Sequence, residues 1–203
     1  MEFLPNEVVN ELKDYIIFKP NNKEELQDAV NLWYKNKDEA LNNYGHISIW
    51  NTSLITDMSE LFYERFQFNE NINNWNVSNV INMDSMFAYC KKFNQPLNNW
   101  NVSNVINMNK MFSFCGKFNQ PLNNWDVSSV TNMDSMFSFC GKFNQPLNNW
   151  NVSNVMNMNS MFSFCTKFNQ NLNNWNVSKV EDMKEMFKCC NSFNQPLNNW
   201  DTS

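Results

Sequence analysis

The stretch FNQPLNNWNVSNVINMNKMFSFCGK occupies residues 93–117, and FNQPLNNWDVSSVTNMDSMFSFCGK follows it directly at residues 118–142. The period of 25 residues extends well beyond this pair, because tryptophan recurs at the same spacing at Trp50, Trp75, Trp100, Trp125, Trp150, Trp175 and Trp200. A fixed period between about 20 and 50 residues is typical of repeat proteins, in which each unit packs on its neighbours. The sequence therefore predicts stacked units in which equivalent side chains lie one above another.

One half of each unit has the spacing of a short amphipathic helix. Met108, Met111, Phe112 and Cys115 stand at positions i, i+3, i+4 and i+7, which places them on one helical face. Asn107 directly precedes them as a favourable N-cap. In two units a glycine follows the cysteine, where a left-handed residue closes a helix: Gly116 and Gly141. We therefore predict a helix of about two turns in each unit.

The other half of each unit has the spacing of a strand. Leu97, Trp100 and Val102 give the pattern L-x-x-W-x-V, with asparagines between them. Pro96 comes just before, where a strand can begin without losing a needed ladder hydrogen bond. Each unit is thus predicted to be a short parallel strand, a turn, a short helix and a return loop. The first such strand is expected over residues 47–53.

The strand pattern, followed by V-x-x-M-x-x-M-F-x-x-C-x-x-F, resembles the BspA-type leucine-rich repeat family, also called mycoplasma lipoprotein-associated repeats. The resemblance covers about residues 44–203. It implies an α/β fold, a right-handed leucine-rich-repeat solenoid of 25-residue rungs that acts through its surface. Family members described as adhesins are surface proteins and are usually exported.

The N-terminal 45 residues differ from the repeats and predict a helical cap, followed by six full repeats and a terminal strand over residues 46–203. Pro5 favours a first helix start, and a second helix is expected from Asn22 to Gly45. Glu25 completes a capping box with Asn22.

The segment LPNEVVNELKDYI, residues 4–16, has two interpretations. It is similar to the start of an F-box, the helical motif that docks adaptor subunits of ubiquitin ligases, which would make the chain a substrate receptor. A capping helix needs the same apolar pattern, so both interpretations stay open. The beginning of the chain shows no basic segment followed by an apolar one, so we predict no signal peptide. A cytoplasmic location, or one inside a virion or host cell, is therefore expected.

Two features of the repeat predict how the stack is held and where it could associate. Asn94, Asn119 and Asn144 recur at one position, and stacking would let their amides pair along the axis and with turn backbone. At the last repeat, Leu197 and Trp200 lie on a predicted strand that no helix follows. An unpaired strand edge invites a second chain, which predicts a homodimer through this edge.

The side chains that usually carry chemistry form no catalytic grouping in the sequence. His46 is the single histidine and lies outside the cysteine series, so we predict no metal site, no cofactor and no enzyme activity. The repeated cysteines are interpreted as buried free thiols that pack like small apolar residues. Cys189 takes the place of phenylalanine in the other repeats and is expected to be more accessible.

The net charge of −5 argues against partners with a phosphate backbone and against anionic membrane surfaces, so neither nucleic acid nor membrane is expected. The chain also contains no run of about 18 apolar residues. We predict a non-catalytic scaffold that binds a protein partner or assembles, with an adhesin for a repetitive ligand as an alternative. The candidate contact residues are Asn98, Asn99, Asn101, Lys110, Lys179 and Lys184.

Overall fold

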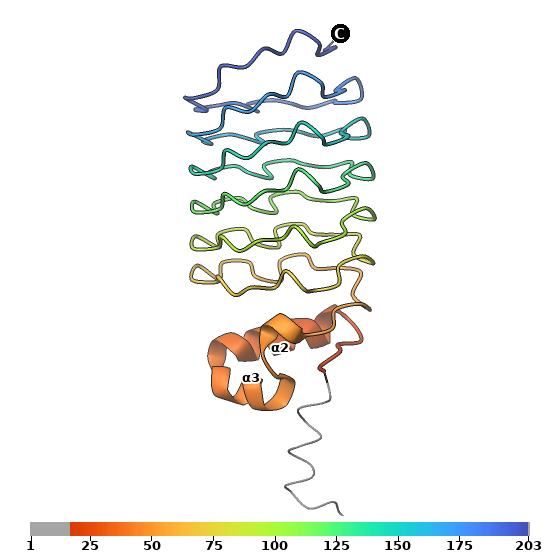
Figure 1. The fold of residues 1–203 in the computed structure, drawn as a ribbon, viewed down its shortest axis with the longest axis vertical. Coiled ribbons are helices and arrows are strands. Elements are labelled where there is room, and N and C mark those ends of the chain that lie inside the picture. Colours follow the sequence, from red (N-terminus) through yellow and green to blue (C-terminus); the bar gives the residue numbers. More distant parts are fainter. Residues whose placement is uncertain (1–16, 203) are drawn as a thin grey trace, which may run out of the picture.

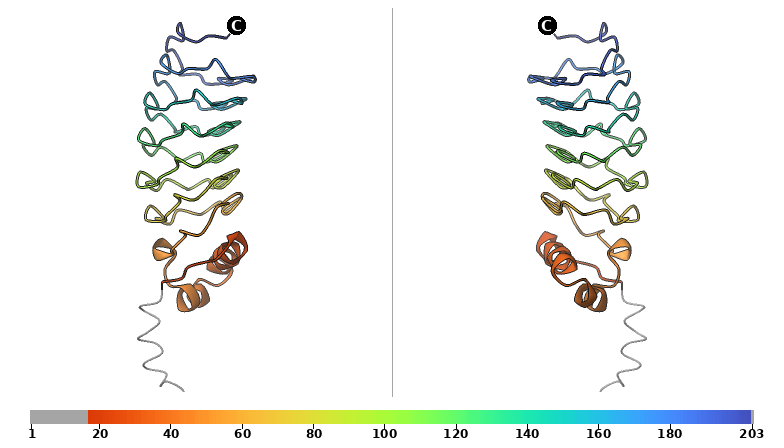
Figure 2. Two further views of the ribbon diagram at one scale, coloured as in Figure 1. Left: turned by 90° about the vertical axis from the view of Figure 1, so that its right-hand side faces the viewer. Right: turned by 90° about the vertical axis from the view of Figure 1, so that its left-hand side faces the viewer.

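The structure is a computed structural model that describes residues 17–202. Its helices are α2 (Lys23–Lys35), α3 (Lys37–Tyr44) and the short 3-10 helix η1 (Ile47–Ile49). From Trp50 onward the chain winds into 25-residue coils that lie one above another, with α2 and α3 at one end (Figures 1 and 2). We call residues 51–202 the coil stack. Within residues 17–202, no helix has the length and hydropathy needed to cross a bilayer.

The predicted α/β leucine-rich-repeat solenoid, with a strand and a helix in every unit, is wrong. Over residues 17–202 the helices end before the coil stack begins, and no strand is present. The coils are joined by isolated parallel bridges, such as those from Asn82 to Asn107 and from Asn107 to Asn132. The strand expected over residues 47–53 is replaced in part by the 3-10 helix η1.

Hydrogen bonds between coils explain why the predicted helices do not form. The N–H of Phe112 donates to the carbonyl of Met136 in the next coil at 2.9 Å, whereas a helix would direct it to Met108. The N–H of Met111 instead closes a tight turn onto the carbonyl of Met108 at 3.2 Å. Successive N–H groups thus alternate between the next coil and the local turn, which satisfies the backbone without a helix.

The residues expected on one helical face are nevertheless all buried. Lys110 and Phe114 have φ values of 51° and 60°, and this pair of left-handed residues recurs four residues apart in every coil. The resulting series of turns places Met108, Met111 and Phe112 inside, as a helix would. The predicted left-handed residues Gly116 and Gly141 have no positive φ.

Asn107 caps a turn, because its Oδ1 accepts from the N–H of Asn109 at 3.0 Å; the prediction that it caps a helix is wrong.

The predicted register of the repeats is confirmed by columns of equivalent side chains. Trp100 and Trp125 stack with ring centroids 6.3 Å apart and planes 4° from parallel. The indole Nε1 of Trp125 donates to the carbonyl of Leu97 at 3.0 Å, and this bond recurs in each coil. Phe112 and Phe137 stack in the same way at 5.7 Å.

The predicted pairing of the asparagine column with turn backbone is also confirmed. The N–H of Asn119 donates to Oδ1 of Asn94 at 2.9 Å, and the N–H of Asn144 donates to Oδ1 of Asn119 at the same distance. Each side chain thus satisfies a turn N–H of the following coil, which ties neighbouring coils together.

The first coil is covered by α2 and α3. Asn22 caps α2 as predicted, because its side chain accepts from the N–H of Glu25 at 3.0 Å. The single helix expected up to Gly45 is broken at Asn36, which ends α2 and caps α3 through its own side chain. Trp33 of α2 packs edge-to-face on Trp50. The predicted first helix and the F-box-like segment, residues 4–16, lie outside the described residues.

At the other end of the coil stack, the terminal strand is not formed. Trp200 closes a turn, with its N–H donating to the carbonyl of Leu197 at 3.1 Å. Both side chains are half-buried and pack on the core of the preceding coil. The N–H groups of Met183 and Phe187 find no acceptor among the described residues, whereas their equivalents Met158 and Phe162 each bond to the next coil.

Candidate binding groove

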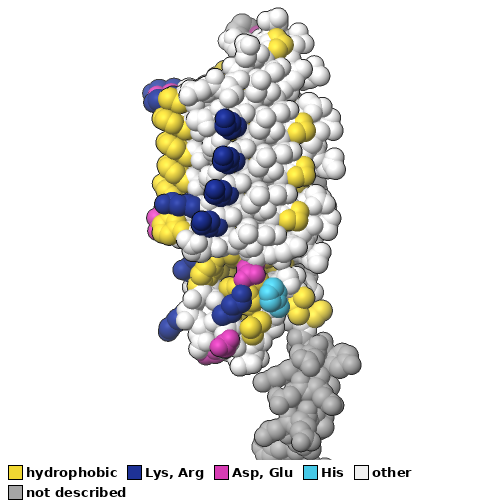
Figure 3. All heavy atoms as spheres, turned by 60° about the vertical axis from the view of Figure 1, so that its left-hand side comes forward, with side chains coloured by type: hydrophobic (Ala, Val, Ile, Leu, Met, Phe, Trp, Pro, Cys, Tyr) yellow, Lys and Arg dark blue, Asp and Glu magenta, His cyan; other side chains and the backbone are white. Residues whose placement is uncertain are grey.

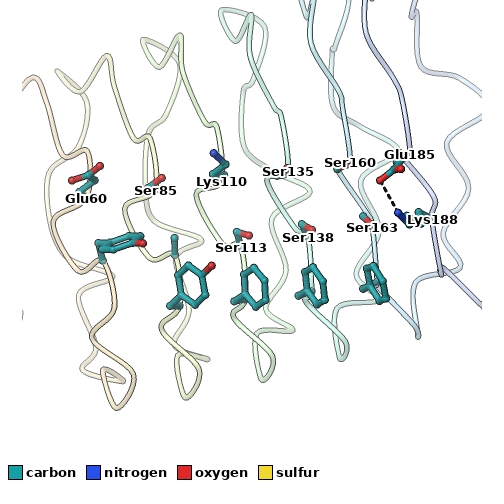
Figure 4. A pocket seen from close by; sticks show the side chains of 16 residues that line it. Glu60, Ser85, Lys110, Ser113, Ser135, Ser138, Ser160, Ser163, Glu185 and Lys188 are labelled. Carbon is teal, nitrogen blue, oxygen red and sulfur yellow. Dashed lines mark hydrogen bonds and ion pairs between the residues drawn. The ribbon is translucent and has the colours of Figure 1, made fainter.

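A groove of about 590 Å³ runs along the coil stack and is lined by residues from successive coils (Figure 4). We refer to its three rows of side chains as the outer row, the floor and the aromatic row. The outer row contains Glu60, Ser85, Lys110, Ser135, Ser160 and Glu185. The floor contains Ala88, Ser113, Ser138 and Ser163, and the aromatic row contains Tyr89, Phe114, Phe139 and Phe164.

The two left-handed residues of each coil create these rows. In the third coil of the groove they are Lys110 in the outer row and Phe114 in the aromatic row. Met111 and Phe112, which lie between them, enter the core, and Ser113 lies at the floor. A regular helix would have placed these positions around a cylinder, so the groove depends on the turns.

The floor serines are buried residues whose backbone groups are hydrogen-bonded, while their hydroxyls make no hydrogen bond to another described residue. Ser113, Ser138 and Ser163 are 5%, 6% and 4% exposed. Figure 4 shows their side chains along the floor of the groove. None of the three hydroxyls has a partner among the described residues, whereas the hydroxyl of Ser135 donates to Asp134 at 2.7 Å. These hydroxyls line the groove, so a ligand with polar groups could form hydrogen bonds with them there.

The aromatic row is a continuous stack. Its ring centroids are 4.4 Å apart from Tyr89 to Phe114, 4.2 Å from Phe114 to Phe139, and 4.4 Å from Phe139 to Phe164, with planes 8–9° from parallel. The rings therefore cover each other's faces and present their edges to the groove and to solvent. Cys189 occupies the next position and is exposed, as predicted.

Charged side chains lie mainly at the ends of the groove. Glu60 lies at one end, and Glu185 pairs with Lys188 at 3.0 Å at the other. This pair is about half exposed, so it contributes little to stability. The exposed ammonium of Lys110 lies between the two ends.

The structure does not bring the predicted contact residues into one site. Among the predicted lysines, only Lys110 lines the groove. Lys179 donates from Nζ to Asn154 at 2.8 Å, and Lys184 is exposed beside the groove. The asparagines lie elsewhere: Asn98 lines a separate hollow of about 110 Å³, Asn99 accepts from Asn98, and Asn101 caps a turn at Ser103.

Neither the floor nor the aromatic row was predicted from the sequence, although a repeated triplet indicates both. The triplet FSF recurs at residues 112–114, 137–139 and 162–164. Its first phenylalanine is buried in the core, and its second lies in the aromatic row. A hydrophobic residue on each side of a serine, repeated at the same position, therefore indicates a second apolar row outside the core.

The cysteine column consists of buried free thiols, as predicted. Cys115 is fully buried, and its Sγ donates to the carbonyl of Phe87 at 3.0 Å. Burial raises the pKa of the Cys115 thiol well above its usual value, and it raises the pKa of Cys190 to about 11. Within residues 17–202, no three His, Cys, Asp or Glu side chains are grouped closely enough to hold a metal ion together.

Two overlapping segments, residues 28–141 and 115–203, match the family described as Mycoplasma protein of unknown function, DUF285. The chain belongs to this family. Membership of the DUF285 family associates the chain with a Mycoplasma protein family, and it does not show the BspA-type leucine-rich repeat that the sequence pattern resembles. No curated protein and no solved structure matches the chain.

Proposed function

We propose that the chain is a non-catalytic scaffold that binds an extended protein partner in the groove. The floor carries this proposal, because three serine hydroxyls line a space of about 590 Å³ at the same position of successive coils, where a ligand can reach them. That volume is typical of ligand sites, which combine apolar walls with a few placed polar groups. The aromatic row supplies the apolar wall.

The register of the floor favours a partner with regularly spaced polar groups. Neighbouring coils joined by parallel bridges lie about 4.8 Å apart, so the floor offers one hydroxyl at each such step. A partner that reaches all three serines must lie along the stack axis and repeat its polar groups. This observation supports the second candidate function, binding of a repetitive ligand. The repeat pattern is similar to that of BspA-type proteins, some of which are described as adhesins. This similarity supports binding through the surface of the coil stack, but it does not extend to the leucine-rich-repeat fold.

A triple variant tests the proposal without disturbing the fold. Ser113, Ser138 and Ser163 are replaced by alanine, the residue that the floor already contains at Ala88. The matched control replaces the same number of serines at another repeat position: Ser103, Ser128 and Ser153. Both variants and the parent chain are assayed on arrays of extended peptides and of linear glycans.

We expect the parent chain to bind a subset of these probes. Each lost hydrogen bond weakens binding by about 0.5–1.5 kcal/mol, so the triple floor variant should bind at least about tenfold more weakly. The control variant should bind like the parent. Binding to the peptide probes would support a protein partner. Binding to the glycan probes would support a repetitive ligand. Equal binding by the floor variant, or no binding by the parent, would contradict the proposal.

A further inference from the structure

A column of lysines runs along the coil stack outside the groove. Figure 3 shows basic side chains in line along the stack. Four exposed lysines share one repeat position, one in each of four successive coils, and we call them the lysine column: Lys92, Lys117, Lys142 and Lys167. None of them lines the groove.

No lysine of the column forms an ion pair within residues 17–202. The ion pairs among the described residues involve Lys23, Lys37, His46 and Lys188, and none involves the column. Residues 91–180 contain seven lysines and two aspartates, although the whole chain has a net charge of −5. Like charges on neighbouring coils repel each other, so an anion on this face would relieve an unfavourable arrangement.

The aromatic row lies close to the lysine column in the sequence of each coil. Phe114, Phe139 and Phe164 each precede a column lysine by three residues, and Phe139 is 39% exposed. Figure 3 shows an apolar column that runs parallel to the line of basic side chains. This face therefore presents a straight positive row beside a straight row of aromatic edges.

We propose that this face docks on an anionic membrane surface, with the lysine column at the lipid phosphates and the aromatic edges at the acyl boundary. Basic side chains beside exposed aromatic ones are typical of proteins that bind at the membrane interface. Neighbouring rings cover both faces of Phe114 and Phe139, so these faces are not available for the base stacking on which single-stranded nucleic-acid binding relies. A phosphate backbone alone would leave the aromatic edges in water.

The net charge of −5 predicts that the chain does not bind anionic membranes. Screening by salt explains why the lysine column can nevertheless bind one. At physiological ionic strength, exposed charges separated by more than about 8 Å are largely screened. A membrane surface therefore responds to the local charge of the lysine column and not to acidic residues elsewhere in the chain. The column lysines do not line the groove, so their contacts with lipid are independent of a groove ligand, whereas the aromatic row belongs to both surfaces.

Vesicle co-sedimentation tests the proposal with the full chain. One set of vesicles contains phosphatidylcholine alone, and in the other about a third of the lipid is phosphatidylglycerol. The column variant replaces Lys117, Lys142 and Lys167 by glutamine. The control variant carries the same change at Lys19, Lys35 and Lys37, which lie before or in the helices of the cap.

We expect the parent chain to bind only the anionic vesicles and to dissociate as salt is added. Loss of three interfacial lysines should weaken binding about a hundredfold, and the control variant should bind within about threefold of the parent. The F139Q variant, which keeps all lysines, should bind more weakly while retaining the salt dependence. A circular-dichroism melt establishes that each variant is folded.

Three results would overturn the proposal. The first is equal binding to neutral vesicles, and the second is equal loss of binding in the column and control variants. The third is binding to a single-stranded oligonucleotide or an acidic peptide, at moderate salt, without any binding to anionic vesicles.

Discussion

The W125F variant tests how much of the stability comes from neighbouring coils. Trp125 is 3% exposed, stacks on Trp100 and donates from Nε1 to the carbonyl of Leu97 at 3.0 Å. Phenylalanine keeps an aromatic ring in the column but removes this donor and part of the buried ring. The carbonyl of Leu97 retains its bond from the N–H of Trp100 at 3.1 Å, so it is not left without a partner.

The expected cost of W125F is about 1.5–3 kcal/mol. The lost indole hydrogen bond contributes about 0.5–1.5 kcal/mol. The smaller ring leaves a void between two coils, and buried truncations of a few atoms cost about 1–1.5 kcal/mol. The cost should therefore exceed that of an ordinary surface substitution by several fold.

The W200F variant is the matched control. Trp200 makes the same bond, from Nε1 to the carbonyl of Leu172 at 2.9 Å, but it is only half-buried and has a described coil on one side. We expect W200F to cost about 1 kcal/mol, because solvent can fill the space that the ring vacates. Urea unfolding followed by circular dichroism gives both values, and a common slope shows that the unfolded states are comparable. Equal costs for the two variants, or a larger cost for W200F, would refute the reasoning.

Three further predictions concern single positions. Hydrogen bonds from the hydroxyl and N–H of Ser128 lower the pKa of Asp126, so the stabilisation is present above the unfolded pKa of about 3.9 and is lost as the pH falls below it. D126N should match the parent in unfolding free energy at pH 7, because asparagine occupies this position in other coils, and it should lose less at pH 3; an equal acid loss in both proteins would contradict this. Burial raises the pKa of the Cys140 thiol, whereas Cys189 is exposed. Alkylation of the native protein at pH 8, followed by mass spectrometry, should therefore modify Cys189 first, and modification of Cys140 at the same rate would disprove the burial. Ser160 has a φ of 51°, so S160N should leave the melting temperature nearly unchanged and S160V should cost about 1–2 kcal/mol; equal stability of the two variants would argue against the left-handed backbone.

The stacking of the repeats could be predicted from the sequence because the period of 25 residues has no slip. Equal spacing puts Trp100 above Trp75 and Asn119 above Asn94 whatever the conformation within a coil. The structure confirms both columns, and the side-chain hydrogen bonds of the asparagines follow from them. Buried positions were likewise predictable, since the apolar residues of each unit are spaced identically.

The conformation within a coil could not be predicted from the same pattern. Met108, Met111, Phe112 and Cys115 have helical spacing, but a series of tight turns buries the same positions. The choice between the two depends on whether an N–H bonds within its own segment or to the next coil. That competition is a tertiary effect, and local propensity does not report it.

The groove and the lysine column show two further limits of sequence reasoning. A helix that begins near Met108 would place Phe114 on its outer surface, away from the buried face. The turns align Phe114 with Phe139 and thereby build the aromatic row. Lys117 and Lys142 share a repeat position and so could have been aligned in advance, but the net charge of −5 concealed their local excess.

The fold described here requires that backbone hydrogen bonds join successive coils, and NMR can detect these bonds one by one. Scalar coupling across a hydrogen bond correlates a backbone nitrogen with the carbonyl carbon that accepts its proton. The structure predicts a correlation from the nitrogen of Phe112 to the carbonyl of Met136, and from Phe137 to Met161. Correlations from Phe112 to Met108 and from Phe137 to Met133 would instead indicate a helix in each repeat and would contradict the account.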